Sequence, residues 1–265
     1  MGELLDLGDG KLAYEVRGRG RPLVFLHPGG FGSAVWDEQL TRFSAHHRCV
    51  RYDARGHGDS SEPPAGFSHH EDLRRLLDAL EIDRAVLIGS SLGSRTAIDF
   101  ALLHPHRVDG LLLASPGMSG MVEQDPFTLE QRRLAAEAIA RQDFPQAFEC
   151  VIRMLVDGPH RTPEQVGPGI RARYLALLTD NARQGHGGFP LGAELHAITR
   201  AAEIRARTLV VTGALDTTDI HAIAELIERE APHARRVSVD GAGHQVNAEQ
   251  PARFDELLGE FLRTG

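Results

Sequence analysis

The sequence predicts an α/β protein with one mostly parallel sheet, helices on both of its faces and an inserted helical cap. Short, wholly apolar runs such as 22–26 and 85–88 alternate with stretches of helical spacing. This alternation is typical of parallel sheets. Between residues 118 and 204 helical patterns follow one another without a convincing strand. We therefore expect an α/β core made of residues 1–117 and 205–265, with a helical cap at 118–204.

The elements can be justified in chain order. An edge hairpin is expected around Gly8-Asp9-Gly10, a helix that begins at a Ser33 cap, and a later helix with a capping box from Ser68 to Glu71. The predicted strands are 4–7, 11–16, 22–26, 49–52, 85–88, 108–114, 208–212 and 236–239. The predicted helices of the cap are 129–142, 145–156, 170–178 and 191–202, and those after it are 219–230 and 251–262.

The most informative stretch is Gly89-Ser90-Ser91-Leu92-Gly93, which lies between a buried strand and a helix that Pro105 ends. Glycines at both ends permit a turn too sharp for side chains. The turn strains the central serine and makes its hydroxyl project. The N-terminus of the following helix favours negative charge. The pattern therefore predicts Ser91 as a nucleophile, with Ser90 as the second choice.

A serine hydroxyl needs a base, and the base needs an orienting carboxylate. Asp216 follows one predicted strand and His244 follows the next. Because carboxyl ends of parallel strands share one edge of the sheet, both should lie near Ser91. The chain order Ser91, Asp216, His244 is the one expected for a nucleophile elbow on such a sheet. Asp240 is the rival acid, although it is too near His244 in the chain for the usual geometry.

Together these segments resemble the α/β-hydrolase family over nearly all of the chain outside 118–204. The matching segments are LHPGG at 26–30, DARGHGDS at 53–60, GSSLG at 89–93, TGALD at 212–216 and GAGHQVNAEQP at 241–251. The resemblance implies that Ser91 is the nucleophile, His244 the general base and Asp216 the acid. It also implies an oxyanion hole of backbone N–H groups from Leu92 and Gly29. Pro28 departs from the usual pattern and leaves Gly30 as the alternative donor.

The serine at the elbow sets the chain apart from the epoxide hydrolases and haloalkane dehalogenases of this fold, which carry aspartate there. The motifs look most like those of enol-lactonases and small esterases. They imply a hydrolase of a carboxylic ester or lactone of a small, largely apolar molecule, acting through an acyl-serine without a cofactor. The alternatives are a carbon–carbon bond hydrolase or perhydrolase with the same triad, and a ligand receptor with residual hydrolysis.

The cap is expected to form the substrate pocket. Its candidate wall residues are Phe144, Phe148, Met154, Tyr174 and Phe189, with Gly30 from the core. The sequence leaves open which of them line the pocket, which substrate binds, and whether the chain is a monomer or a homodimer.

Composition and charge limit the kinds of partner and the cellular location that we expect for this protein. The net charge of −8 argues against nucleic acid or an anionic membrane surface as a partner. No signal peptide or long apolar run is evident, so the expectation is a cytoplasmic protein that binds a small molecule. The two cysteines are expected to be reduced and buried. The pairs His46-His47 and His69-His70 project apart, so no metal site is expected.

Overall fold

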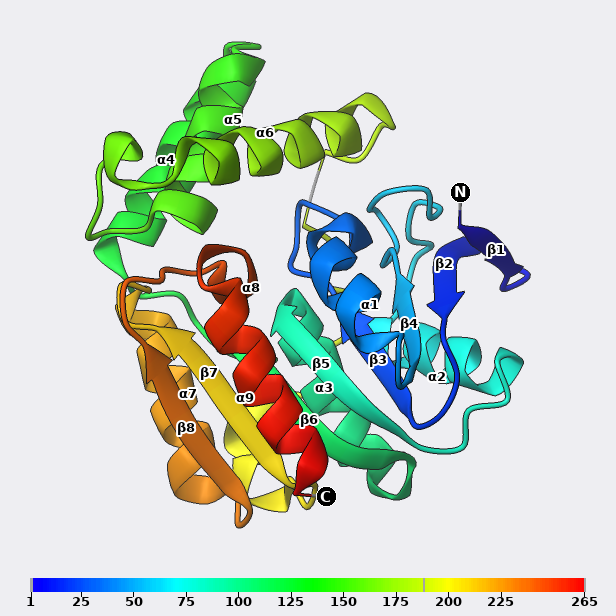
Figure 1. Cartoon of the computed structure of the whole chain (residues 1–265). Helices are drawn as coiled ribbons and strands as arrows, with labels where there is room; N and C mark the ends of the chain where they lie inside the picture. The colour runs from blue at the N-terminus through cyan, green and yellow to red at the C-terminus, as the bar shows by residue number, and fades with distance from the viewer. Residues whose placement is uncertain (1, 188, 265) are drawn as a thin grey trace.

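The structure is a computed structural model that describes residues 2–187 and 189–264. Its centre is an eight-stranded sheet in the order β1-β2-β4-β3-β5-β6-β7-β8 (Figure 1). Only the pairings β1–β2 and β2–β4 are antiparallel. All pairings from β4 to β8 are parallel, so the carboxyl ends of these strands meet at one edge. The predicted fold class is confirmed.

The strands are β1 (Glu3–Asp6), β2 (Lys11–Arg17), β3 (Pro22–Leu26), β4 (Arg48–Tyr52), β5 (Ala85–Ser91), β6 (Val108–Pro116), β7 (Thr208–Gly213) and β8 (Ala234–Val239). The α-helices are α1 (Asp37–Phe43), α2 (His69–Ala79), α3 (Leu92–Leu103), α4 (Pro126–Ala140), α5 (Phe144–Ile152), α6 (Pro168–Arg183), α7 (Thr218–Glu230), α8 (Val246–Glu249) and α9 (Pro251–Arg263). Short helical turns are η1 (Ser33–Trp36), η2 (Pro105–Arg107), η3 (Arg153–Asp157), η4 (Pro163–Gln165), η5 (Ala197–Thr199) and η6 (Ala201–Glu203).

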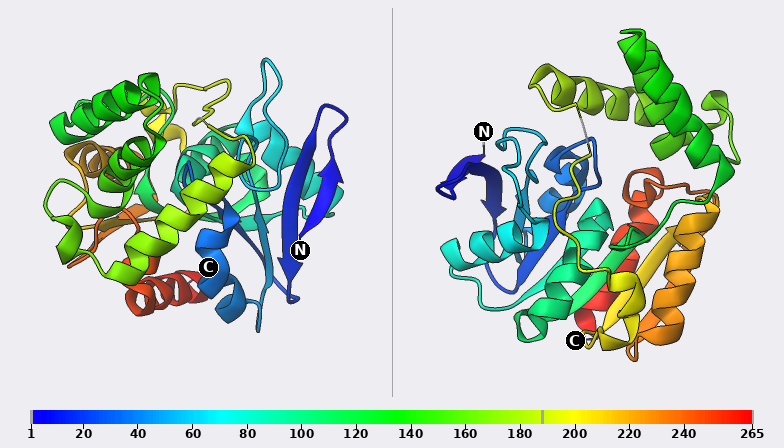
Figure 2. Two further views of the ribbon diagram at one scale, coloured as in Figure 1. Left: turned by 90° about the horizontal axis from the view of Figure 1, so that it is seen from above. Right: turned by 180° about the vertical axis from the view of Figure 1, so that it is seen from behind.

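Each face of the sheet has its own hydrophobic core, because successive side chains of a strand point to opposite faces. In β3, Val24 and Leu26 pack with α2, α3 and α7 on one face. Leu23 and Phe25 pack with α1 and α9 on the other. Figure 2 shows the same two helical layers from above and from behind. The continuous apolar runs are therefore explained by burial on both sides.

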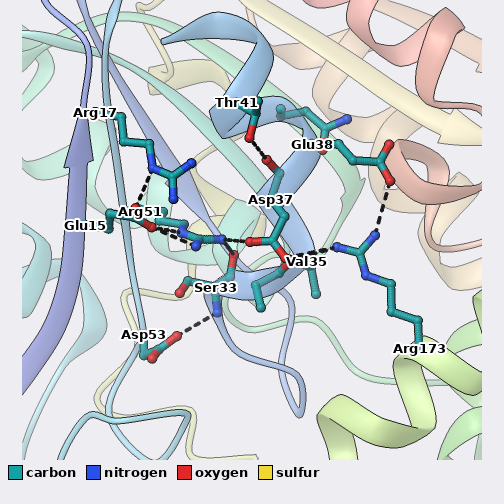
Figure 3. A network of polar contacts seen from close by, with 12 residues as sticks. Glu15, Arg17, Ser33, Val35, Asp37, Glu38, Thr41, Arg51, Asp53 and Arg173 are labelled. Carbon is teal, nitrogen blue, oxygen red and sulfur yellow. Dashed lines mark hydrogen bonds and ion pairs between the residues drawn. The ribbon is translucent and has the colours of Figure 1, made fainter. Parts of the chain in front are cut away.

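Between β6 and β7 the described residues form helices and turns without a strand, and Figure 1 shows α4, α5 and α6 over one end of the sheet. Arg173 of α6 ties this cap to the core: it donates to the carbonyl of Ala34 at 2.8 Å and reaches Glu38 of α1 at 3.4 Å (Figure 3). The domain boundaries at 117/118 and 204/205 stay a prediction. Within the described residues, no helix is both long enough and apolar enough to cross a lipid bilayer.

Two predicted helix caps are wrong. Ser33 is the first residue of η1, and Gly32 precedes it. The Ser33 N–H donates to Asp53 at 2.7 Å, so a carboxylate from the loop after β4 satisfies this helix start (Figure 3). Ser68 does occupy the N-cap of α2, but its side chain makes no capping hydrogen bond. Its expected partner Glu71 instead binds both Arg74 Nε and NH2, at 2.8 and 2.6 Å.

The predicted helix 191–202 is also wrong. The chain is irregular up to His196 and then forms the two short turns η5 and η6. Gly192 and His196 have φ of 68° and 53°, in the left-handed region that interrupts a right-handed helix. Glu194 is held by Arg95 of α3 and by the N–H of Gly120. These contacts with the core outweigh the local helical pattern.

Candidate active site

Ser91 lies at the junction of β5 and α3, with φ of 51° and ψ of −109°. A non-glycine residue rarely adopts this conformation. Neighbouring glycines make the junction possible, since a Cβ at Gly89 would lie 2.5 Å from the Gly93 carbonyl oxygen. A Cβ at Gly93 would lie 2.1 Å from the Leu26 carbonyl oxygen. The chain therefore passes close to β3, and Ser91 lines a cavity while Ser90 is buried beneath it.

Asp216 and His244 form a buried pair. Asp216 follows β7 and His244 follows β8, and the two loops are joined by a hydrogen bond of 2.9 Å from the Leu215 N–H to the Ala242 carbonyl. The His244 Nδ1 lies 3.0 Å from each carboxylate oxygen of Asp216. Asp216 Oδ1 also accepts the Thr217 N–H at 2.8 Å. These contacts orient the ring with Nδ1–H toward the acid, which leaves Nε2 as the basic nitrogen.

His244 Nε2 is buried and has no hydrogen-bond partner among the described residues. His244 and Ser91 line the same cavity, of about 130 Å³. A buried basic nitrogen without a partner is costly unless a donor reaches it. The Ser91 hydroxyl is the donor that the proposed triad would supply.

The two groups shift each other's pKa. Burial by itself would lower the pKa of His244, but the facing Asp216 carboxylate outweighs burial and raises this pKa above its ordinary value. Burial by itself would raise the pKa of Asp216, but His244 and its hydrogen bond lower it. The pair therefore favours a carboxylate beside an imidazole that readily accepts a proton. Asp240, the rival acid, is exposed at the end of β8.

The predicted oxyanion donors Leu92 and Gly29 come from α3 and from the loop after β3. Leu92 is the first residue of α3, so its N–H has no acceptor within the helix. Leu92 and Gly29 line the cavity with Ser91, whereas Gly30, with φ of 88°, lines the adjoining chamber. This placement favours Gly29 over Gly30 as the second donor, and the roles of both stay a prediction.

A larger apolar chamber of about 670 Å³ lies between the cap helices. It shares Arg132, Met154 and Phe189 with the cavity that Ser91 and His244 line. A Cβ on Gly29 or Gly30 would come within 2.9 or 2.8 Å of the Phe189 ring. The glycine loop thus lets this ring lie over the boundary between the two spaces. Phe144 and Phe148 line the chamber, and their contact with substrate stays a prediction.

Tyr174 needs correction. Its side chain is 0% exposed and packs edge-on against Phe31 with ring centroids 4.8 Å apart. Aromatic residues of a cap helix can face the pocket or the core, and the sequence does not distinguish the two. We therefore remove Tyr174 from the proposed pocket wall.

Four charged residues line the cavity of Ser91 and His244 that the sequence did not predict there: Arg95, Glu123, Arg132 and Asp219. Arg95 is paired with Glu194, and Arg132 with Glu123. A signal existed for Arg95, because it follows Ser91 by four residues and so lies one helical turn beyond it on α3. Arg132 is on a cap helix whose orientation the sequence does not give.

Histidines of the core loops brace the structure instead of facing the cavity. His27 Nε2 accepts the Ala54 N–H at 2.9 Å, and its ring packs edge-on to His57 at 4.9 Å.

Arg55 is fully buried and binds Asp72 and Asp9 at 2.8 and 2.7 Å. In residues 2–187 and 189–264, no group of three or more His, Cys, Asp or Glu side chains could hold a metal ion.

The comparisons with known proteins identify the family and the fold. Residues 22–251 match the family described as alpha/beta hydrolase fold. A solved hydrolase from Pseudomonas aeruginosa is 31% identical with a TM-score of 0.83, covering 98% of each chain. Est816, described as an N-acyl homoserine lactone degrading enzyme, is 29% identical with a TM-score of 0.78, covering 98% of this chain and all of its own. The 2-hydroxy-6-oxo-6-phenylhexa-2,4-dienoate hydrolase of Comamonas testosteroni is 26% identical, covering 97% of this chain and 93% of its own.

Proposed function

The chain belongs to the alpha/beta hydrolase family, and on that premise we propose that it cleaves a carboxylic ester or lactone through an acyl-serine intermediate. The observation that carries the proposal is the Asp216–His244 pair, because His244 lines the same cavity as Ser91 and its buried Nε2 has no hydrogen-bond partner among the described residues. No metal or cofactor is needed for this chemistry.

The reaction follows from the properties of these groups. The Ser91 hydroxyl attacks the substrate carbonyl while His244 Nε2 takes its proton. The N–H groups of Leu92 and Gly29 hold the oxyanion, each contributing about 3 kcal/mol. His244 then protonates the leaving oxygen, and the acyl-serine forms. Water activated by the same imidazole releases the acid and restores Ser91.

The chamber in the cap supports a substrate with a sizeable apolar part. The reacting carbonyl would occupy the small cavity at Ser91, and the apolar part would extend past Phe189 into the larger space. The likeness to a lactone-degrading enzyme supports a lactone or ester that carries an acyl chain. The likeness to a dienoate hydrolase keeps carbon–carbon bond cleavage by the same triad as the second candidate.

The test begins with a fluorophosphonate, which reacts preferentially with an activated serine. We expect one labelled residue, Ser91, with labelling lost in Ser91→Ala and kept in Ser90→Ala. A panel of p-nitrophenyl esters and lactones of increasing chain length should then show repeated turnover, best for chains that fill the chamber. Labelling elsewhere would refute the nucleophile, and a single turnover would instead indicate a receptor-like protein.

A further inference from the structure

We infer that Glu249 and Arg161 form a positioning pair that holds the loop of His244 and ties it to the cap. Glu249 is the last residue of α8, and Arg161 lies in the cap between η3 and η4. Neither residue contacts the reacting atoms in the proposed mechanism. The inference rests on the proposed triad, because it concerns how the general base of that triad is held.

First, Glu249 binds the backbone of the histidine loop, residues 243–245. Its Oε1 accepts the N–H of Gly243 at 3.1 Å and the N–H of Gln245 at 3.2 Å. These are the two residues that flank His244. One carboxylate oxygen thus fixes the backbone on both sides of the base. The hydrogen bonds to Asp216 set the orientation of the imidazole ring, and Glu249 sets the position of the His244 backbone that carries the ring.

The second step is the connection to the cap. Arg161 NH1 pairs with Glu249 Oε2, and the two side chains are only 9% and 4% exposed. The other nitrogens of Arg161 donate to the carbonyls of Val156 and Asp157, both at 2.9 Å. A Cβ at Gly243 would lie 2.1 Å from Arg161 NH2, so only glycine lets the guanidinium pass this close. The planar guanidinium of Arg161 therefore joins the backbone of residues 156–157 to the Glu249 carboxylate.

The third step is the place of the cap segment that Arg161 holds. Val156 and Asp157 belong to η3, a π-helical turn, and such turns are frequent at functional sites. Met154 and Leu155 of the same turn line the cavity with Ser91. The buried Asp157 carboxylate is bound by Arg153 at 3.0 Å and Arg171 at 2.8 Å, which fixes the turn. The pocket wall and the base loop are thereby held as one unit.

Glu249 also affects the pKa of His244, the proposed base. The negative charge of Glu249 adds to that of Asp216 in raising the pKa of His244. The other charged groups that line the cavity are Arg95, Glu123, Arg132 and Asp219. Removing the Glu249 charge should therefore lower the pKa of His244. The base must be neutral to act, so the acid limb of the rate profile should move to lower pH.

The experiment measures the rate of Ser91 labelling by the fluorophosphonate, and ester kcat and KM, as functions of pH in two variants. Glu249→Gln removes the charge and breaks the pair with Arg161. We expect kcat to fall about 10-fold or more with little change in KM, and the acid limb to shift to lower pH. Glu249→Asp keeps the charge but is too short to reach both N–H groups. It should lower the rate without moving the acid limb.

The control is Arg173→Gln, which breaks a different contact between cap and core, the ion pairs of Arg173 with Asp37 and Glu38 of α1. It should leave the labelling rate and its pH profile unchanged. A Glu249→Gln protein with native circular dichroism and a wild-type rate and profile would overturn the inference. If that variant fails to fold, a wild-type rate in Glu249→Asp would overturn it instead. Failure of the wild-type protein to be labelled would refute the triad itself, which is a separate outcome.

Discussion

At the scale of single residues, the most unusual backbone in the site is that of Ser91. Its φ of 51° and ψ of −109° lie where a Cβ is strained, at a cost of roughly 1–3 kcal/mol. The surrounding elements maintain this conformation, because β5 and α3 are both well buried on either side of it. The protein would then give up stability to present the hydroxyl to the cavity.

This strain predicts a difference between two inactive variants. Ser91→Gly and Ser91→Ala both remove the hydroxyl, so neither should be labelled or turn over ester. Only glycine relieves the strained φ, and the relief exceeds its entropic cost in the unfolded chain. We expect Ser91→Gly to exceed Ser91→Ala by about 1 kcal/mol in the free energy of unfolding, measured by urea denaturation. Equal stabilities would show that the backbone at residue 91 is not strained.

A residue of the site could be predicted from the sequence only where a local pattern, such as the end of a strand, determines its position. Ser91, Asp216 and His244 could be proposed because each lies at or just after the end of a recognisable strand, and the structure brings Asp216 and His244 together. Glu249 lies within the matched segment after His244, but its partner Arg161 is distant in the chain. Tyr174 was misplaced for a similar reason, since a helical pattern gives the buried face and not what covers it.

At the scale of elements, the site depends on how closely α3 approaches the sheet. Gly93, Ala97 and Ala101 form a stripe of small buried residues at a spacing of four. The approach is closest at Gly93, where a Cβ would lie 2.1 Å from the Leu26 carbonyl oxygen. That oxygen belongs to the backbone of β3 and cannot swing away, so a side chain at residue 93 must displace the strand or the helix.

We therefore expect Gly93→Ala to lower the free energy of unfolding by at least about 2 kcal/mol, as overpacking does, and to slow Ser91 labelling because the elbow shifts. Gly169→Ala is the matched control. Gly169 also lies in the first turn of a helix, α6, but a Cβ there meets nothing within 4 Å. It should be neutral or slightly stabilising, because alanine is the better helix former. Thermal unfolding of both variants tests this prediction, and equal melting temperatures would contradict the close approach of α3 to β3.

Predictions of elements succeeded where periodicity and burial agree. The strands of the core were placed because a parallel sheet buried on both faces requires continuous apolar runs, and β3, β5 and β7 all have them. The segment after residue 190 failed because contacts with α3 determine its path. Local sequence carries little information about such contacts, so the cap was predictable as helical but not in its arrangement.

At the scale of the whole molecule, three buried histidines lie together beneath the loops of the site. Burial lowers the pKa of His27 to about 4, of His57 to about 3 and of His69 to about 4. His27 joins the segments after β3 and β4, and His57 contacts the Arg55 carbonyl within the second of them. His69, the first residue of α2, bonds the carbonyl of Pro190. The folded protein therefore keeps all three neutral under conditions in which the unfolded chain would protonate them.

This difference predicts that the fold becomes less stable in mild acid. An exposed histidine has a pKa near 6.5, so below that pH the unfolded chain binds protons that the folded protein excludes. Each of the three should cost on the order of 1 kcal/mol per pH unit as the pH falls from 6.5 toward 4. The melting temperature should fall by several degrees per pH unit in that window. His57→Asn, which retains a donor for the Arg55 carbonyl, should reduce the slope of melting temperature against pH by about the share of one histidine, whatever its effect at neutral pH.

His46→Asn serves as the control because His46 is exposed, and it should leave this slope unchanged. A melting temperature independent of pH between 6.5 and 5 would mean that these histidines are protonated in the folded protein.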